Sequence, residues 1–307
     1  MLDDQLRNSV ENCPRIDPSA YKQGVAQAFG SSAVVYHQFA QLQRHCAQQL
    51  LHQLQQRITA VSTVASTSAP SVASSVASSV ASGFDPIPGP VLEVGCGTGF
   101  LSEKLVQCFP QSEVVLSDLA EPMLAFCRSQ LAPLLADRSV PVQFHVMDGE
   151  HLDKPDRPYG LIMSSFALQW FQNPTQALQN WLNLTVPGGW IAVAFPSVYS
   201  FPEWRSACEV SGVPYTANPL PAFQAVVGSI APLVRDCHFA STWHTSEHPH
   251  PRHFFQHLKA MGTGYRPAAA SLTPTQWKHL WRTWENQVGE KQPIMVSYHV
   301  VYLIVRR

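Results

Sequence analysis

The sequence predicts an α/β protein with a doubly wound, mostly parallel sheet of seven strands, preceded by N-terminal helices and carrying a helical lid after the fifth strand. Two observations predict this fold class. Short runs rich in β-branched residues alternate with helix-length segments between Pro90 and Pro196, and three glycines at alternate positions follow the first run. Such alternation is typical of parallel strands joined by crossover helices.

The N-terminal segments are predicted to be an extension followed by helices. Residues 1–20 are polar and hold two prolines, which favours a loose extension. Apolar residues then recur at spacings near three and four over 21–58, which predicts helices that cap the site formed by the sheet. Gly30-Ser31-Ser32 is expected to divide them.

A serine-rich segment follows over residues 59–85. It contains SVASSVASSVAS at Ser71–Ser82, with valines at i and i+4 that could form a helical stripe. Serine and valine are mediocre helix formers, however, and Pro70 and Gly83 flank the repeat. A flexible linker is the favoured interpretation, and no function is assigned to it.

The remaining residues, 86–307, are predicted to form the main α/β domain. Strands are expected at 91–94, 114–118, 142–148, 160–165 and 190–196, and helices at 99–109, 121–136 and 172–185. Pro187-Gly188-Gly189 is the predicted turn into the fifth strand. Strands near 237–246 and over the closing SYHVVYLIVRR should complete the sheet, while the lid lies mainly in 197–235 and 250–290.

Composition excludes several classes of protein. The 307 residues carry a formal net charge of −1, which gives no whole-molecule attraction to nucleic acid or a membrane. Seven cysteines without C-x-x-C pairs form neither a disulfide framework nor a zinc ribbon. No stretch approaches the length of a membrane span, and the start lacks an apolar core of signal-peptide length. We therefore expect a reduced, cytoplasmic compartment. A monomer is also expected.

The run VLEVGCGTGF, residues 91–100, raises the question of which ligand approaches the glycines. Its G-x-G-x-G spacing differs from the phosphate-binding G-x-x-x-x-G-K-[ST] and from the dinucleotide-binding G-x-G-x-x-G. Glu93, Asp118 and Asp148 would form an acidic rim at the strand ends, where ligands of parallel sheets bind. That rim suits a cationic ligand with a ribose and an adenine, such as S-adenosylmethionine. The alternative is a tight turn in another doubly wound fold.

The expected cofactor-binding residues follow the strand ends. They are Glu93, Gly95, Cys96, Gly97, Gly99, Asp118, Leu119, Met123, Asp148, Gly149, Glu150 and Ser164.

These motifs resemble the class I S-adenosylmethionine-dependent methyltransferases, which have a Rossmann-like sheet. Five further segments resemble malonyl-[acyl-carrier-protein] O-methyltransferases of biotin synthesis, in register from Phe29 to Arg307: FGSSAVVY (29–36), AQLQR (40–44), ALQWF (167–171), LKAMG (258–262) and Tyr298-His299. Residues 1–20 and the serine-rich insertion depart from the family. The resemblance implies methyl transfer to the free carboxylate of a malonyl thioester on acyl-carrier protein or coenzyme A.

A carboxylate acceptor is already ionised at neutral pH, so methylation needs no general base. A dry site favours the reaction because two opposite charges disappear. We expect the neutral donors Trp170 and Gln43 near the carboxylate and Tyr36 over the cofactor. The alternative is that all three only pack in the core.

Charge asymmetry suggests where an acidic carrier protein would dock. Residues 197–307 carry 10 Lys and Arg against 6 Asp and Glu, whereas residues 1–196 carry 10 against 15. Arg205, Lys259 and Arg266 are the candidate docking residues. A solvated lid surface is the alternative.

The pattern His248-x-His250-x-x-His253-x-x-x-His257 invites a metal site. Two prolines interleave it, no cysteine or carboxylate of suitable spacing accompanies it, and the expected reaction needs no metal. We expect no metal and a mostly solvated segment.

Two other functions remain open from the sequence. One is methylation of a small free acid such as aconitate, which would use a closed acceptor pocket. The other is a non-catalytic binding subunit, although Glu93, the three glycines, Asp118 and Asp148 are all present.

Overall fold

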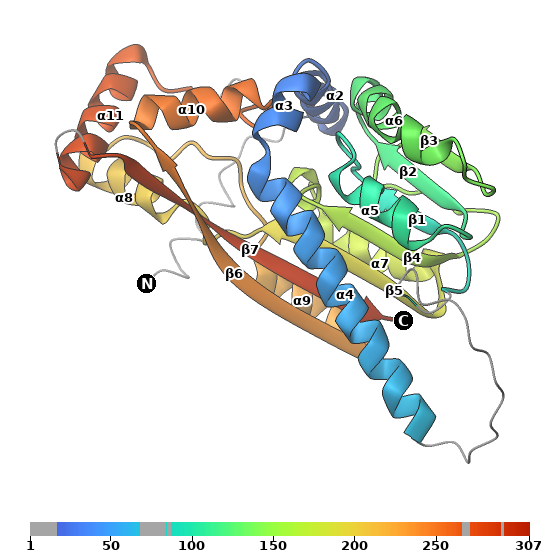
Figure 1. The fold of residues 1–307 in the computed structure, drawn as a ribbon. Helices are drawn as coiled ribbons and strands as arrows, with labels where there is room; N and C mark the ends of the chain where they lie inside the picture. Colours follow the sequence, from blue (N-terminus) through green and yellow to red (C-terminus); the bar gives the residue numbers. More distant parts are fainter. Residues whose placement is uncertain (1–16, 68–83, 85–86, 266–270, 290–291) are drawn as a thin grey trace.

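One sheet of seven strands organises the described part of the chain, in the order β3-β2-β1-β4-β5-β7-β6 (Figure 1). The computed structural model describes residues 17–67, 84, 87–265, 271–289 and 292–307, without the side chains of 62–67. The strands are β1 (Val91–Val94), β2 (Val114–Asp118), β3 (Val142–Val146), β4 (Tyr159–Ser165), β5 (Thr185–Pro196), β6 (Asp236–His248) and β7 (Ile294–Arg306).

The topology places a binding crevice at the carboxyl ends of β1 and β4. The first five strands are parallel, and β7 lies antiparallel between β5 and β6. From β1 the chain adds β2 and β3 on one side, then returns to add β4 on the other. Ligands of doubly wound sheets bind at such a reversal. The predicted fold class is confirmed.

The fifth strand differs from its prediction. It begins at Thr185, so Pro187-Gly188-Gly189 lies within it rather than before it. Residues 186–189 separate Thr185 from Trp190, whereas Gly160 alone separates their partners Tyr159 and Leu161. The extra residues form a bulge, in which Gly188 has a φ of 81°.

Helices cover both faces of the sheet. They are α2 (Pro18–Gly30), α3 (Ala33–Phe39), α4 (Gln41–Thr67), α5 (Phe100–Cys108), α6 (Glu121–Leu135), α7 (Pro174–Leu184), α8 (Pro202–Ser211), α9 (Phe223–Ile230), α10 (Pro251–Ala260) and α11 (Pro274–Val288). Side chains of α4, α5 and α6 form one buried cluster with the sheet, and those of α7 and α9 form another on the opposite face.

Two N-terminal boundaries require correction. Helix α2 begins at Pro18, inside the stretch predicted to be loose, because the Asp17 carboxylate accepts the Ser19 N–H and proline suits a first helical position. Helix α4 continues to Thr67, beyond the predicted end at 58. The repeat at 71–82 lies outside the described residues.

The segments predicted to form a lid have a buried core of their own. Helices α8, α10 and α11 pack around Phe201, Trp204, Phe254 and Trp284, against the end of the antiparallel β6–β7 pair (Figure 1). Helix α9 also lies in the range predicted as lid, but it packs on the sheet beside α7 because Val226 and Ile230 are buried there.

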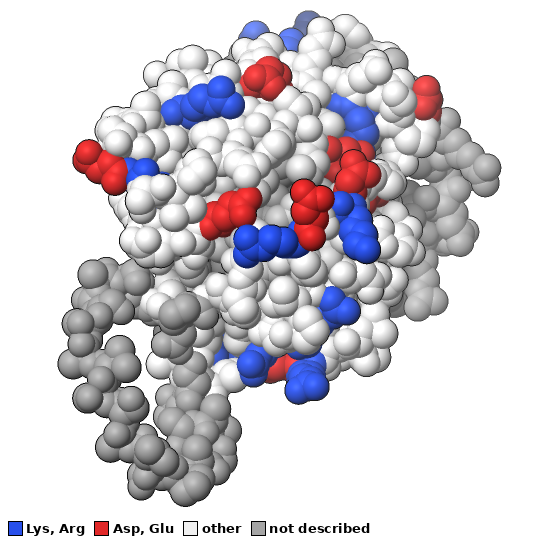
Figure 2. All heavy atoms as spheres, turned by 90° about the vertical axis from the view of Figure 1, so that its right-hand side faces the viewer, with Lys and Arg blue, Asp and Glu red and all other residues white. Residues whose placement is uncertain are grey.

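Surface charge and hydropathy agree with the composition. Among the described residues on the face shown in Figure 2, Lys and Arg lie among Asp and Glu, without a broad area of one sign. No described helix is both long and apolar enough to span a bilayer.

Candidate functional site

The glycine turn after β1 requires glycine for its backbone conformation. Gly95, Gly97 and Gly99 have φ values of 72°, 54° and 97°, which L side chains rarely adopt. A Cβ atom on Gly95 would also lie 2.5 Å from the Cβ of Ala167. The turn therefore presents bare backbone to the crevice, and Gly99 caps α5.

Asp118 at the end of β2 anchors this turn. Its two carboxylate oxygens accept the backbone N–H groups of Gly97 and Ala120, both at 2.8 Å. Burial raises the pKa of Asp118, and hydrogen bonds from Ala120, Gly97 and Leu119 partly offset that rise. Since each oxygen has a second lone pair, the carboxylate can also accept hydroxyls of a ligand.

Glu93 is the buried acid of the site. It is 1% exposed, accepts the Ser102 hydroxyl at 2.6 Å and lines the cavity beside the glycines. Burial raises its pKa well above the usual range, against the effect of the Ser102 hydrogen bond. No described Lys or Arg forms an ion pair with it. An ammonium group on a ligand would supply the missing charge.

The first cavity is bounded by these acids and by an aromatic wall. Its volume is about 870 Å³, including the part open to solvent. Phe29 and Trp170 meet edge to face with ring centroids 5.1 Å apart, and Tyr36 stacks on Phe100 at 6.1 Å. Burial, then the charge of Asp118, raises the pKa of Tyr36, so its phenol stays protonated.

The carboxylates of Glu93, Asp118 and Asp148 fit S-adenosylmethionine, because each can accept hydrogen bonds from the ligand. Glu93 suits an ammonium, Asp118 suits ribose hydroxyls, and Asp148 at the far end suits an adenine amino group. Of the expected cofactor residues, those that line this cavity are Glu93, Gly95, Cys96, Gly97, Asp118, Leu119, Met123, Asp148 and Gly149.

Three expected cofactor residues lie elsewhere. Gly99 faces a separate hollow at the start of α5. Glu150 is buried behind Asp148, where it accepts the N–H groups of Gln172 and Asn173. Ser164 is fully buried, and its hydroxyl has no hydrogen-bond partner among the described residues. Its neighbour Ser165 lines the cavity instead.

A second cavity, of about 670 Å³, adjoins the first. Gln43, Phe166 and Trp170 line both cavities, so they form the wall between them. Among the described residues that line the second cavity, none is charged or a histidine. Its polar groups are neutral, and they include Gln169, Asn218 and Tyr298.

Phe166 is a site residue that the sequence did not predict. Its φ of 59° is unusual for a bulky side chain and is held by two hydrogen bonds, from its N–H to the Ala194 carbonyl and to its own carbonyl from the Gln169 amide. Such backbone strain clusters at functional sites. Nothing in the sequence signals this conformation.

Lys22 of α2 was also missed. It lines the first cavity and contacts Asp148 and Glu150. A signal was available, because Lys22 is the only Lys, Arg, Asp or Glu between Pro18 and Gln43.

The predicted docking residues differ in their surroundings. Arg205 is half-buried, donates to the Val198 carbonyl at 3.1 Å and lies over the Tyr215 ring at 4.4 Å. Lys259 is exposed on α10, next to Leu258 of the second cavity. Arg266 lies outside the described residues.

The histidine-rich segment is less solvated than expected. His250 and His253 are exposed, but His248 at the end of β6 is only 5% exposed. Its two ring nitrogens lie 3.0 Å from the Ser246 hydroxyl and 3.3 Å from Nδ1 of His253. Strand pairing with β7 carries His248 inward, which its neighbours in the sequence do not reveal.

Comparison with known proteins gives the family. A family model described as a methyltransferase domain matches residues 91–189. A malonyl-[acyl-carrier protein] O-methyltransferase from Magnetococcus marinus is 33% identical over 222 residues, 69% of this chain and 76% of that protein. The biotin biosynthesis bifunctional protein BioCD of Bordetella avium is 28% identical over 279 residues, 91% of this chain and 51% of that protein.

A solved structure from Bacillus halodurans shares the fold. Its TM-score is 0.51 at 14% identity, over 72% of this chain and 93% of that one. The relative from Magnetococcus marinus shows the family as well as the fold, because the match covers most of both sequences. The chain belongs to the malonyl-[acyl-carrier protein] O-methyltransferases and is an S-adenosylmethionine-dependent O-methyltransferase.

Proposed function

We propose that this enzyme methylates the free carboxylate of a malonyl thioester carried by acyl-carrier protein, giving the methyl ester used in biotin synthesis. The observation that supports this most is the neutral wall shared by the two cavities. Gln43 and Trp170 line both cavities, and their side chains carry neutral N–H groups. These groups can donate to an acceptor bound at this wall.

The site suits a carboxylate nucleophile. Bound S-adenosylmethionine supplies a methyl group on a positively charged sulfur. Neutral N–H donors orient a carboxylate without the strong charge neutralisation of an ion pair. Apolar residues around them, such as Phe166 and Leu258, exclude water and thereby favour the loss of two opposite charges.

The lining also favours a malonyl thioester over a small polyacid. A tricarboxylate such as aconitate would bring two further charges into a cavity whose described lining has no Lys or Arg. A malonyl thioester brings one carboxylate and an uncharged arm.

The carrier itself would be steered by the lid. We place its docking face on the exposed side chains of Arg252, Lys259, Lys278 and Arg282 of α10 and α11, with Arg266 as a further candidate. Arg205 is the weakest candidate, because its guanidinium is already engaged.

Mass spectrometry of the products tests this function. The protein is incubated with S-adenosylmethionine and, separately, malonyl-acyl-carrier protein, malonyl-coenzyme A and aconitate. Fastest addition of one methyl group to the carrier-bound malonyl group is the expected result. Methylation of aconitate alone would overturn the proposed acceptor, and tight cofactor binding without any methylated product would favour a binding subunit.

Replacing Trp170 by phenylalanine is expected to lower kcat by roughly 10- to 100-fold while leaving cofactor affinity nearly unchanged. The variant keeps an aromatic ring against Phe29 but loses the only N–H of the indole. Steady-state kinetics with the malonyl carrier measures the effect. Trp277→Phe in the lid core is the matched control. An unchanged kcat would mean that Trp170 only packs.

A further inference from the structure

One face of α2 forms a wall of the cofactor cavity. Lys22, Val25 and Phe29 follow one another at helical spacing, and all three line the cavity. Lys22 is the only Lys, Arg, Asp or Glu of α2 and α3, and among the described residues it forms the ion pairs that join these two helices to the rest of the protein.

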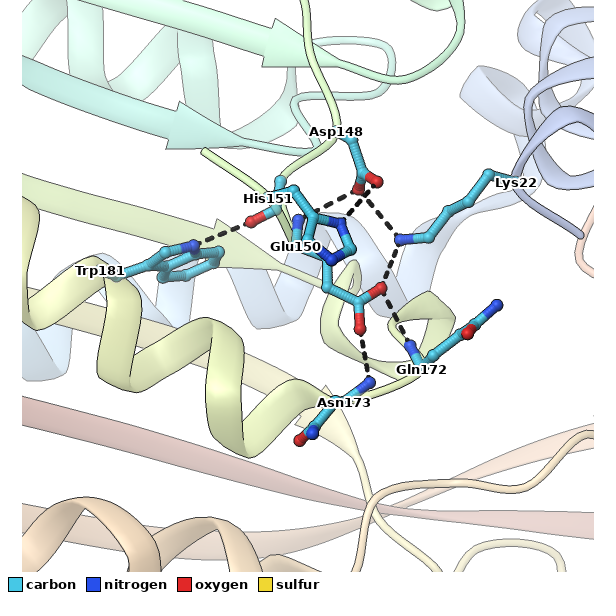
Figure 3. Close-up of polar contacts among 8 residues, drawn as sticks. Lys22, Asp148, Glu150, His151, Gln172, Asn173 and Trp181 are labelled. Carbon is cyan, nitrogen blue, oxygen red and sulfur yellow. Dashed lines mark hydrogen bonds and ion pairs between the residues drawn. The ribbon is translucent and has the colours of Figure 1, made fainter. Parts of the chain in front are cut away.

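The Lys22 ammonium joins two carboxylates (Figure 3). Its Nζ lies 3.0 Å from Oδ1 of Asp148 and 2.6 Å from Oε2 of Glu150, and 4.9 Å from the centre of the Phe171 ring. The side chains of Lys22 and Glu150 are 13% and 5% exposed. A pair so far removed from water is screened little by salt.

Lys22 is one of three groups that fix the Asp148 carboxylate. Oδ1 also accepts the Glu150 N–H at 3.1 Å, and Oδ2 lies 3.1 Å from Nδ1 of His151. Burial by itself raises the pKa of Asp148, but the contacts with Lys22 and His151 outweigh it and hold that pKa below its usual value. The carboxylate is therefore ionised and oriented at neutral pH.

Glu150 connects Lys22 to the segment that follows Trp170. Its carboxylate accepts the N–H groups of Gln172 and Asn173, and Asn173 is the N-cap of α7 (Figure 3). Gln172 stands two residues after Trp170. Lys22 thus connects the capping helix, the adenine end of the cavity and the segment that carries Trp170.

A metal ion is the competing interpretation of this cluster. One ligand atom each from Asp148, Glu150 and His151 lies within 4.8 Å of the others. The Lys22 ammonium already supplies positive charge at hydrogen-bonding distance from both carboxylates. The carboxylates thus have their counter-ion within the chain.

We propose that Lys22 is a positioning residue of the cofactor site. Its ammonium holds α2 over the cavity, orients Asp148 toward the cofactor and, through Glu150, fixes the segment after Trp170. Helix α2 and the adenine end of the site are thereby ordered together. This role concerns cofactor binding and does not depend on the identity of the acceptor.

The test compares Lys22→Met with Lys22→Arg in the full chain. Calorimetry with S-adenosylhomocysteine should show affinity at least about tenfold weaker for Lys22→Met, and within about threefold of the parent for Lys22→Arg. Amide hydrogen exchange of the free protein should be faster in α2 and α3 of Lys22→Met, and unchanged in α4. In kinetics, KM for S-adenosylmethionine should rise more than kcat falls.

Lys104→Met is the matched control, because it removes one positive charge from a more exposed pair with Glu103 on α5. If Lys22→Met binds S-adenosylhomocysteine as tightly as this control, Lys22 does not position the site. Faster exchange in α2 with unchanged affinity would overturn the proposal equally, since Lys22 would then serve only the helix. Failure of Lys22→Arg to restore affinity would show that the positive charge is not what matters.

Discussion

Replacing Asp118 by asparagine should weaken S-adenosylhomocysteine binding by roughly 100-fold. The carboxylate accepts the N–H groups of Gly97 and Ala120 on its two oxygens. An asparagine must turn its NH2 group toward one of these donors, which leaves that N–H unsatisfied and loosens the glycine turn. The substitution also removes the negative charge of the carboxylate that would accept hydrogen bonds from the ribose hydroxyls. Isothermal calorimetry measures the loss directly.

Glu121→Gln is the control for the Asp118 variant. Glu121 is an exposed carboxylate at the start of α6, three residues along the chain. Its replacement changes the net charge equally and should leave binding unaltered. If both variants bind as tightly as the parent, Asp118 does not hold the ribose and the assignment of the strand end fails.

Mild acid should destabilise the folded protein through His248. Burial, then the charges of His257 and His253, lowers the pKa of His248 from 6.5 to about 4. Between these values the unfolded chain binds a proton that the folded protein excludes, so stability is full above pH 6.5 and falls as pH drops toward 4. From pH 7 to pH 5 the free energy of unfolding should fall by about 2 kcal/mol through this group.

His248→Gln measures this contribution by difference. The variant keeps a polar side chain near Ser246 but has no group to protonate. Urea denaturation at pH 7 and pH 5 should show a smaller loss of stability in the variant than in the parent. Exposed His52→Gln on α4 should keep the parental pH dependence. Equal losses in all three proteins would show that His248 is not the titrating group.

Part of the lining of the first cavity was predictable from the sequence. Glycine is strongly favoured where φ is positive, and the acids of a parallel sheet meet where strands end, so the GCGTG turn, Asp118 and Asp148 point to one ligand. Nine of the expected cofactor residues do line one cavity. The ranges of β1, β2 and α6 were predicted to within one residue, because the periodicity of these elements depends on residues that are neighbours in the chain.

Features set by packing between distant segments could not be predicted. Helix α9 was assigned to the lid, since its apolar residues do not reveal which surface buries them. His248 was expected to be solvated, but pairing of β6 with β7 carries it inward. The strained backbone of Phe166 has no sequence signal at all.

The sequence by itself determined the α/β sheet, the glycine turn and the acids at the strand ends, because strand periodicity and glycine turns depend on residues that are neighbours in the chain. Only the tertiary structure brought Gln43 and Trp170 into one wall and Lys22 onto Asp148 and Glu150. These partners are separated by more than a hundred residues along the chain, and hydrogen bonds and ion pairs depend on distances that only packing sets.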